Sequence, residues 1–412
     1  MRKCIYVFDE YVSSQKNGIG SFLKEFHYCM EQLNVDVCVL TFNADVTEFA
    51  IQIGENSKME QMLFPRFLSG SFVSNVEIII KFFRLYIQDS SNNVFFINHS
   101  PCENLVEILK INYPLSKIVF TIHDLGWTSK CMGDVDKYKR IIERKDDVEE
   151  DVRYVLGFYA KEVRVYELVD RIVCLSRDTY NLLQTVYQVY PDKIHLIPNG
   201  FRKGEDGSQD IIDKERLKRE LFIPTYEKII LYVGRPTLQK GMYALINAFH
   251  NVLKKNSDVR LVIIGSDNSN RIENLINISS SFASRVSFLG LINKEELEKW
   301  YLVADIGVIP SYYEQCPYVG IEMMKYGLPI VTSDGFGIRN MFQNGINALI
   351  APIGNREDSE DFSYNLAKAI DKLLSSEELR NTLGRNAQEM FFNCYDTNQM
   401  RKGYEELLIS MS

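Results

Sequence analysis

The stretch IILYVGRPTLQKG, residues 229–241, decides the fold of this chain. Its first five residues are apolar and rich in β-branched and aromatic side chains, which predicts a buried strand. A turn containing Gly234 follows directly, and a helix is expected to begin near Met242. A buried strand, a glycine turn and a helix in this order form the repeating unit of open parallel sheets.

The same alternation of short apolar runs and longer amphipathic runs fills the chain. The first series of predicted strands covers residues 4–8, 35–42, 94–98, 118–123, 172–175 and 194–197, and the second covers 229–233, 260–264, 286–289, 306–309 and 329–332. A loop rich in Pro, Asn, Gly and charged residues, 197–210, separates the two series. Because 412 residues exceed what one core normally holds, we predict an α/β protein with two Rossmann-like, doubly wound domains, 1–203 and 204–394, and a terminal segment, 395–412, containing a helix.

Two segments interrupt or vary this pattern. Residues 127–151 are dense in charge, and they predict either a helical insertion beside the ligand crevice or a solvated face. Residues 72–87 are the most hydrophobic segment, but Glu77, Lys81 and Arg84 lie at helical spacing within it. An amphipathic helix is therefore expected instead of a membrane span, with core packing as its role and peripheral membrane contact as the alternative.

Charge and cysteine content narrow the class of protein. A net charge of -8 and a pI near 5.4 argue against nucleic acid as the main partner, although a local basic pocket is compatible with them. The eight cysteines are scattered and never spaced C-x-x-C. They predict reduced, buried thiols in a cytosolic protein, and the N-terminal sequence lacks the apolar stretch of a signal peptide.

Polar residues and glycines follow the predicted strands at their carboxyl ends, where open α/β sheets form their ligand crevices. In the first half these residues are Asp9, the run Asn98-His99-Ser100, the pair His123-Asp124 and the run Pro198-Asn199-Gly200. In the second half they are Gly234-Arg235, Gly265-Ser266, Gly290-Leu291, Ser311 and Ser333-Asp334. We expect the functional residues among them.

The turn from Gly234 to Gly241 has the properties of a phosphate-binding loop. Arg235 and Lys240 lie on either side of the turn and can converge on one anionic group. The residues alone are equally compatible with a surface turn that carries two solvated cations. The spacing of an ATPase phosphate loop is absent, which argues against that class.

A second candidate element is EQCPYVGIE, residues 314–322, at the end of another predicted strand. Pro317 suits the first turn of a helix, whose amides form an anion site, and Gly320 would let a ligand approach the backbone. Glu322 could accept hydrogen bonds from a vicinal diol such as ribose, and Glu314 could hold a sugar hydroxyl. Solvated glutamates are the alternative.

These two elements together resemble the retaining family 4 glycosyltransferases of GT-B fold, also described as glycosyl transferases group 1. The resemblance covers roughly residues 225–395 and implies two Rossmann-like domains that face a cleft, with the terminal helix crossing back to the first domain. It implies that the first domain binds the acceptor and the second the nucleotide sugar. It implies donor diphosphate binding by Arg235 and Lys240, ribose binding by Glu322, a position of Glu314 against the donor sugar, and further substrate contacts from Gly234, Leu291, Cys316, Pro317, Tyr318, Val319 and Gly320.

The first half matches the same family less tightly. The run Asn17-Gly18-Ile19-Gly20-Ser21 resembles its glycine-rich loop near donor phosphate and acceptor, although a plain strand-to-helix turn is the alternative. His123 resembles its strand-end histidine near the reacting sugar. His99, Asp124 and Asn199 are further substrate-binding candidates, and Asp124 or Asp9 could orient the acceptor. A nicotinamide-dependent dehydrogenase would need G-x-G-x-x-G, which is missing.

The resemblance also implies a mechanism without metal or cofactor. The leaving diphosphate, stabilised by Arg235 and Lys240, would deprotonate the acceptor on the same face of the sugar, so that catalysis rests on positioning and electrostatics. No Asp-x-Asp pair follows a predicted strand in a metal-binding setting. We expect activity in excess chelator, with a nucleotide diphosphate hexose, taken as UDP-linked, as donor.

The acceptor stays open between several classes. The runs YVFDEYVSSQKNGIG, NVFFINHSPCE and IVFTIHDLGWTS resemble a Bacteroidetes group of glycosyltransferases associated with modified ribosomal peptide loci, which would make the acceptor a peptide or natural product. A lipid-linked or polysaccharide acceptor is the alternative, with the protein in the cytoplasm or on the inner face of the membrane. Two other classes share the fold: a catalytically silent protein that binds a sugar nucleotide or supports a partner, and a pyridoxal-phosphate phosphorylase.

Overall fold

The structure is a computed structural model that describes residues 3–9, 18–53, 60–66, 76–98, 101–143, 149–204, 213–267 and 269–411. The chain forms two compact units. The first consists of Met1–Cys131, Val135–Gly200 and Thr397–Ser412, and the second of Met132–Asp134 and Phe201–Asp396. The chain passes between the units after Gly200 and after Asp396, and the short segment Met132–Asp134 also belongs to the second unit.

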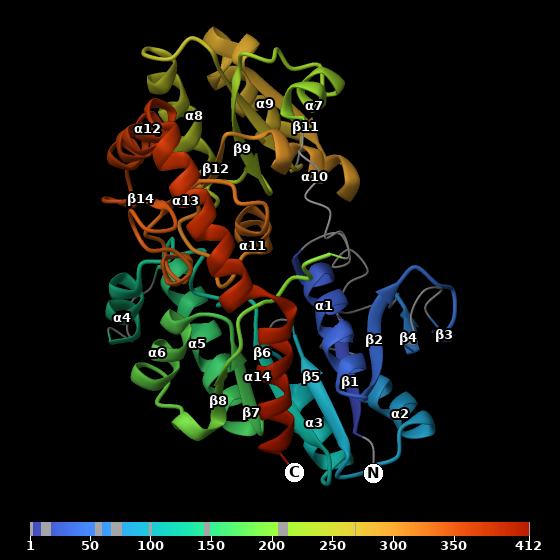
Figure 1. The fold of residues 1–412 in the computed structure, drawn as a ribbon. Helices are drawn as coiled ribbons and strands as arrows, with labels where there is room; N and C mark the ends of the chain where they lie inside the picture. The colour runs from blue at the N-terminus through green and yellow to red at the C-terminus, as the bar shows by residue number, and fades with distance from the viewer. Residues whose placement is uncertain are drawn as a thin grey trace. The chain divides into compact units, whose positions relative to one another are not determined.

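The first unit is built on one sheet with the strand order β3-β4-β2-β1-β5-β6-β7-β8 (Figure 1). Its strands are β1 (Cys4–Asp9), β2 (Asp36–Ala44), β3 (Ala50–Ile53), β4 (Glu60–Pro65), β5 (Asn93–Ile97), β6 (Lys117–Ile122), β7 (Arg171–Cys174) and β8 (Ile194–Leu196). Neighbouring strands are parallel except for the antiparallel pair β3 and β4. The six strands predicted in this half are present, whereas β3 and β4 were not predicted.

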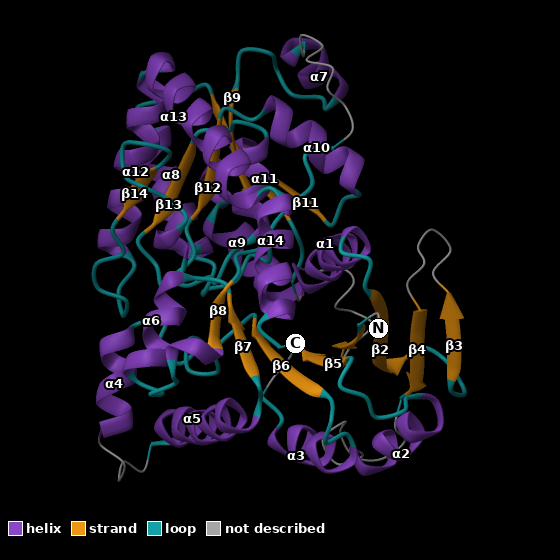
Figure 2. Ribbon diagram, turned by 60° about the horizontal axis from the view of Figure 1, so that its bottom comes forward, coloured by secondary structure: helices purple, strands orange, loops and turns teal. Residues whose placement is uncertain are grey.

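Helices cover both faces of this sheet. They are α1 (Gly18–Gln32), α2 (Val76–Tyr86), α3 (Glu103–Asn112), α4 (Val135–Glu143), α5 (Glu150–Leu168), α6 (Arg177–Thr185) and α14 (Thr397–Ile409). Figure 2 shows α1 and α14 together on one face and α2, α3 and α5 on the other. The expected amphipathic helix in 72–87 is α2, and the charged segment 127–151 contributes α4 and the start of α5, with Trp127 and Tyr138 fully buried.

The terminal helix α14 is anchored within the first unit by packing and hydrogen bonds. The ring of Tyr404 packs edge-on against Phe26 of α1, with 4.9 Å between ring centroids. The hydroxyl of Thr397 donates to the buried Glu25 carboxylate at 2.8 Å. Gly403 permits close approach to the strand layer, because a Cβ there would lie 2.9 Å from Ile197. These contacts hold the last helix on the sheet that the first residues of the chain began.

The second unit contains an all-parallel sheet with the order β11-β10-β9-β12-β13-β14. Its strands are β9 (Lys228–Val233), β10 (Val259–Ile264), β11 (Val286–Gly290), β12 (Ile306–Ile309), β13 (Ile330–Ser333) and β14 (Leu349–Ala351). Its helices are α7 (Lys214–Glu220), α8 (Met242–Leu253), α9 (Ser269–Ile278), α10 (Lys294–Val303), α11 (Tyr318–Lys325), α12 (Glu360–Ser375) and α13 (Glu377–Met390). The five predicted strands are present, and only β14 was not predicted. The strand order reverses between β9 and β12, which creates a topological switch point.

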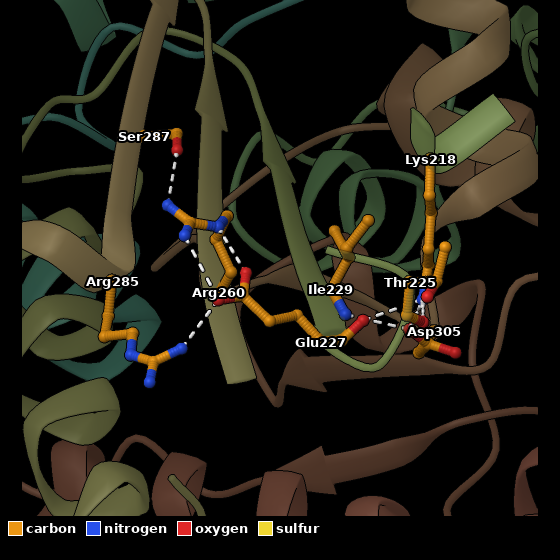
Figure 3. A network of polar contacts seen from close by, with 8 residues as sticks. All are labelled: Lys218, Thr225, Glu227, Ile229, Arg260, Arg285, Ser287 and Asp305. Atoms are coloured by element: carbon orange, nitrogen blue, oxygen red, sulfur yellow. Dashed lines mark hydrogen bonds and ion pairs between the residues drawn. The ribbon is translucent and has the colours of Figure 1, made fainter. Parts of the chain in front are cut away.

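A buried ion network stabilises the amino-terminal edge of this second sheet (Figure 3). The carboxylate of Glu227, which is 2% exposed, accepts two hydrogen bonds from Arg260 at 2.6 and 3.2 Å and one from Arg285 at 2.6 Å. Nearby, Lys218 donates to the Glu227 carbonyl at 2.7 Å, and Asp305 accepts the Ile229 amide at 2.8 Å. The charges are therefore paired at the edge opposite to the strand ends that carry the candidate site.

Two further features bear on the sequence predictions. None of the eight cysteines, all of which lie in the described ranges, forms a disulfide. Within those same ranges, no helix is both long enough and apolar enough to span a bilayer.

Candidate active site

The loops that follow β9 and β12 meet at the switch point of the second unit. Tyr312 donates its amide to the carbonyl of Gln239 at 2.9 Å, which ties the two loops together. Gly241, with φ of 70°, lies so close to the β12 loop that a Cβ would be 1.8 Å from the Pro310 carbonyl oxygen. Only glycine fits this approach without displacing backbone. The two candidate elements of the sequence thus form one local structure.

Lys240 and Glu314 form an ion pair at this junction. The Lys240 ammonium donates to Oε1 of Glu314, and the hydroxyl of Ser311 donates to the same oxygen at 3.1 Å. Both charged side chains are mostly buried, with 26% and 17% of their area exposed. An ammonium has three donors, so Lys240 can contact Glu314 and a second anion at the same time.

Arg235 is exposed on the same loop, and its backbone is fixed from beneath. Its carbonyl accepts the hydroxyl of Tyr232 at 2.7 Å and the amide of Thr237 at 2.8 Å. Burial raises the pKa of Tyr232 well above its usual value, so this phenol is a donor at neutral pH. Among the described residues, the Arg235 guanidinium has no ion-pair partner. The loop therefore presents one paired and one unpaired cation.

Glu322 lies on α11 and is held by a tyrosine from α10. Tyr301 donates its hydroxyl to Oε2 of Glu322 at 2.7 Å, and its ring stacks on Tyr326 with 5.3 Å between centroids. Burial raises the pKa of the Glu322 carboxyl, while the Tyr301 hydrogen bond and the charges of Lys294 and Lys325 lower it. The Tyr301 bond leaves Oε1 and the remaining lone pairs of Oε2 for other donors.

The residues between the two glutamates form the start of α11. Pro317 is the N-cap residue, and Tyr318 and Val319 lie in the first turn. Cys316 and Tyr318 are buried. Gly320 differs from the expectation that it opens the backbone to a ligand: its amide donates to the Pro317 carbonyl at 3.0 Å, and a Cβ would lie 3.4 Å from Ile309, Met341 and Phe342. This glycine lets α11 pack against the core.

Three neighbouring strands of the second sheet end in glycines with positive φ. Gly234, Gly265 and Gly290 follow or end β9, β10 and β11. The Gly234 amide donates to the Ile264 carbonyl and the Gly265 amide to the Gly290 carbonyl, both at 2.8 Å. A Cβ on Gly265 would lie 2.0 Å from the Gly234 carbonyl oxygen. Leu291, directly after the last of them, is 70% exposed. The carboxyl ends of these three strands therefore present glycine backbone without side chains, next to the exposed apolar side chain of Leu291.

The Glu314 loop is also supported by the loop after β13. The Glu314 amide donates to the Phe336 carbonyl at 3.0 Å. Gly337, with φ of 77°, passes so close that a Cβ would lie 1.8 Å from the Glu314 carbonyl oxygen. The backbone of Glu314 is therefore fixed between the ends of three strands.

In the first unit, His123 lies at the carboxyl end of β6. Its Nε2 is 3.4 Å from Oδ1 of Asn98, and its ring packs edge-on against Phe22 with 4.5 Å between centroids. The amide nitrogen of Asn98 is buried and has no hydrogen-bond partner within the described ranges. Asp124 is exposed, and its Oδ1 accepts the Leu125 amide at 2.9 Å and the Thr128 hydroxyl at 3.0 Å.

The other predicted residues of this unit lie at nearby strand ends. Gly18 begins α1 and is exposed, and Gly20 is buried in the first turn of that helix. Asn199 is buried after β8, near the end of the segment Val135–Gly200. Asp9 is buried at the end of β1. His99 and Asn17 lie outside the described residues.

Several residues that hold the candidate side chains were not predicted. They are Tyr232 and Tyr301 in the second unit and Glu162, Tyr138 and Tyr187 in the first. Buried Glu162 accepts the Gly126 amide at 3.1 Å and the Tyr187 hydroxyl at 2.5 Å, and so anchors the loop that follows His123. Ser311, which supports Glu314, was among the strand-end residues named from the sequence. The tyrosines lie in segments whose sequence gives no sign of these bonds.

No group of three or more His, Cys, Asp or Glu side chains is gathered for a metal ion within the described residues. The cationic groups at the switch point are Arg235 and Lys240. The site therefore offers two cations, a carboxylate beside one of them, a second carboxylate held by a phenol, and an edge of exposed glycine backbone. Such a set can bind a diphosphate and a diol at once.

The chain is similar to known glycosyltransferases. Residues 16–203 match the model of Glycosyltransferase Family 4, and residues 213–390 match that of Glycosyl transferases group 1. An uncharacterized glycosyltransferase of Methanocaldococcus jannaschii is 29% identical over 234 residues, which span 56% of this chain and 58% of that protein.

Solved structures establish the fold over nearly the full chain. Sucrose-phosphate synthase of Thermosynechococcus elongatus superposes with a TM-score of 0.77 at 20% identity, covering 98% of each chain. Alr3699/HepE of Anabaena in complex with UDP and glucose superposes with a TM-score of 0.74 at 16% identity, covering 99% of this chain and 100% of that one. The predicted GT-B fold with two Rossmann-like domains is confirmed.

Proposed function

We propose that this chain, whose two halves are glycosyltransferase domains of GT-B type, transfers a hexose from a nucleotide diphosphate sugar with retention of configuration and without metal. The observation that carries the proposal is the joined loop pair at the switch point of the second unit, where Lys240 pairs with Glu314 and the same loop carries Arg235. A ligand crevice is expected at this point in an open α/β sheet.

The two cations match a donor diphosphate. Arg235 has a guanidinium that no described carboxylate engages, and Lys240 keeps donors beyond the one given to Glu314. Together they can supply the positive charge that a metal ion provides in other transferases. We infer that Arg235 and Lys240 stabilise the leaving diphosphate, with Gly234 allowing close approach.

The rest of the donor fits around this anchor. We place the ribose hydroxyls on Glu322, because its carboxylate is held in orientation by Tyr301 and keeps free acceptor sites. The base would lie beside Leu291 near the glycines that end β9, β10 and β11. The sugar would lie beside Glu314 and the start of α11, with Cys316, Pro317, Tyr318 and Val319. We take UDP as the carrier, since Alr3699/HepE of similar fold binds UDP and glucose.

The proposed chemistry is a single exchange at the anomeric carbon. The bond from that carbon to the diphosphate oxygen breaks, and a bond to the acceptor oxygen forms on the same face. The acceptor proton passes to a phosphate oxygen of the leaving group, so no protein base is required. Glu314 and Lys240 position the reacting groups, and their preorganisation lowers the barrier.

The first unit would bind the acceptor at the carboxyl ends of its strands. We assign His123 to the reacting sugar, where Asn98 orients its ring. Gly18, Gly20, His99, Asp124 and Asn199 are assigned to substrate contacts on the same edge. The Oδ1 atom of Asp124 accepts the Leu125 amide and the Thr128 hydroxyl, which holds the carboxylate in place for this contact.

We propose a peptide side chain or related natural product as acceptor, on the resemblance of the first half to glycosyltransferases near modified ribosomal peptide loci. We place the protein in the cytoplasm, since its cysteines are scattered and in no C-x-x-C spacing. An acceptor screen that finds transfer to a lipid-linked or polysaccharide acceptor instead would favour the alternative, a protein at the inner face of the membrane.

The test is a thermal-shift and donor-hydrolysis screen with UDP-glucose, UDP-N-acetylglucosamine, UDP-galactose and GDP-mannose, with and without EDTA. We expect one donor to raise the melting temperature and to be hydrolysed slowly in EDTA. Stabilisation without any turnover, even with acceptor candidates present, would favour a silent sugar-nucleotide-binding protein. Loss of turnover in EDTA that manganese restores would contradict metal independence.

Two substitutions test the site itself. Lys240→Ala and Glu314→Gln should each abolish turnover while the protein stays folded. Lys255→Ala is the matched control, because it also removes a lysine that pairs with a carboxylate, Asp371 at 3.0 Å, elsewhere in the second unit. Wild-type rates in either site variant, or equal losses in the control, would remove the assigned roles.

A further inference from the structure

The amino-terminal edge of the first sheet carries a hollow far from the strand ends that hold His123. Strands β1, β5, β6 and β7 are neighbours in the sheet, and β1, β6 and β7 begin at or directly after Lys3, Lys117 and Arg171. These three cations line a cavity of about 570 Å³. Sites for small molecules commonly measure about 300–1,000 Å³, so the hollow is large enough for one.

Among the described residues, the cations around this hollow outnumber the carboxylates. The one carboxylate in the described lining is Asp170, which accepts the Ile118 amide and the Lys110 ammonium, both at 2.8 Å, and lies 4.0 Å from Lys117. Lys3 donates to a carbonyl, that of Leu408, at 2.8 Å. Within the described residues, Lys3 has no carboxylate partner.

Arg171 is in the same situation. Its guanidinium donates to the carbonyls of Asp170 and Ser410, both at 2.9 Å, and to the Ser410 hydroxyl at 3.3 Å. No described carboxylate pairs with it. Burial lowers the pKa of the Lys3 ammonium, and the neighbouring charge of Lys117 lowers it further, as expected for like charges gathered without an anion.

We propose that this hollow is a second anion site of the protein, and that it binds a small organic phosphate. A phosphate oxygen can accept from Lys3, Lys117 and Arg171 at once, which relieves their mutual repulsion. Leu115 and Met411 supply an apolar wall for the rest of the ligand. The site lies in the first unit and uses none of the residues assigned to the donor.

Occupancy of the hollow would stabilise the terminal helix. Lys3 and Arg171 already bind the carbonyls of Leu408 and Ser410 at the end of α14. A phosphate that fixes these two side chains also fixes their grip on the helix. The ligand would therefore reduce the opening of α14 from the sheet.

The experiment measures phosphate binding in a protein whose donor site is disabled. In the variant Arg235→Ala with Lys240→Ala, we titrate glucose 6-phosphate, inorganic pyrophosphate and, as the neutral control, glucose. We follow affinity by calorimetry and protection of residues 397–411 by hydrogen exchange. We expect the phosphates to bind and to protect α14, glucose to do neither, and affinity to fall with added salt.

Two variants locate the site. Lys117→Gln and Arg171→Gln, made in the same background, should each weaken phosphate binding by about tenfold, the effect of one lost charge-assisted contact. Lys139→Gln, an exposed lysine on α4 outside the hollow, is the matched control and should bind as before. Because Arg171 also holds α14, Lys117→Gln carries the test if Arg171→Gln does not fold.

Three results would overturn the proposal. Absence of phosphate binding once the donor site is disabled would leave the donor loop as the anion site. Binding that Lys117→Gln leaves unchanged would place the phosphate outside the hollow. Binding of pyrophosphate but not of glucose 6-phosphate would reject an organic phosphate as the ligand.

Discussion

Tyr301→Phe tests whether Glu322 is the ribose-binding group and whether its orientation matters. The substitution removes one hydroxyl, which donates to Oε2 of Glu322 at 2.7 Å, and keeps the ring that stacks on Tyr326. A hydrogen bond to a charged group contributes about 1.5–3 kcal/mol, and the partial exposure of Glu322 favours the low end. We therefore expect UDP affinity to fall by roughly tenfold.

The same variant has a predicted pH signature. Burial holds the pKa of Glu322 above its ordinary value, and the Tyr301 bond lowers it. Removing the bond raises this pKa further, so the carboxylate becomes protonated at a higher pH. The acidic loss of UDP binding should then move to higher pH when affinity is measured from about pH 5 to about pH 8.

The assay compares UDP with 2′-deoxy-UDP and 3′-deoxy-UDP as competitors of donor hydrolysis. The wild type should prefer UDP, and both Tyr301→Phe and Glu322→Gln should reduce that preference. Tyr326→Phe is the control, because its hydroxyl bonds Glu298 and not Glu322. If Tyr301→Phe keeps both the preference and the pH profile of the wild type, Glu322 is not the ribose acceptor that Tyr301 orients.

Three further predictions concern stability. Gly241→Ala should lower the melting temperature by several degrees and weaken donor binding, because a Cβ would lie 1.8 Å from the Pro310 carbonyl oxygen. Its control is Gly345→Ala, which has a similar positive φ but open space around it, and which should lower the free energy of unfolding only by the conformational cost of about 1–2 kcal/mol. Burial raises the pKa of Glu162 from 4.5 to about 7, so between these pH values the folded state binds more protons than the unfolded state. The free energy of unfolding should therefore fall by up to about 3 kcal/mol as the pH rises through this window. In urea titrations, Glu162→Gln should abolish this fall. Glu227→Ala should cost up to about 3 kcal/mol by leaving the partly buried Arg260 and Arg285 without their shared carboxylate, while the folded fraction keeps its donor affinity.

Much of the fold was predictable because its strands are continuous apolar runs. Parallel strands that are buried on both faces read as unbroken runs of Val, Ile and Leu, and every predicted strand is present. The missed strands lack this signal. β3 and β4 form the edge of their sheet and mix polar residues such as Gln52 and Gln61 with apolar ones, and β14 has only three residues.

The candidate site was predictable as residue types at strand ends, but its internal contacts were not. Sequence spacing placed Lys240 and Glu314 on two strand-end loops, and the fold brings them into one ion pair. The sequence carried no signal that Tyr301, on a different helix, would donate a hydrogen bond to Glu322. Such pairs depend on how two helices pack on the same sheet, which periodicity along one segment does not reveal.

The glycines show why residue type alone misassigns roles in this site. The sequence suggested that Gly320 faces a ligand, whereas it is filled in by core side chains of the second unit. Gly241 and Gly337, by contrast, are needed for the backbone of the site. Both have positive φ, and a Cβ on either would lie 1.8 Å from a backbone carbonyl oxygen. They therefore allow three loops to pack closely at Lys240 and Glu314. Because the charged side chains lie on these packed loops, substitution of either glycine should reduce both stability and donor affinity. Substitution of the charges should reduce donor binding and turnover but leave stability unchanged, and this separation distinguishes the residues that build the site from those that bind the substrate.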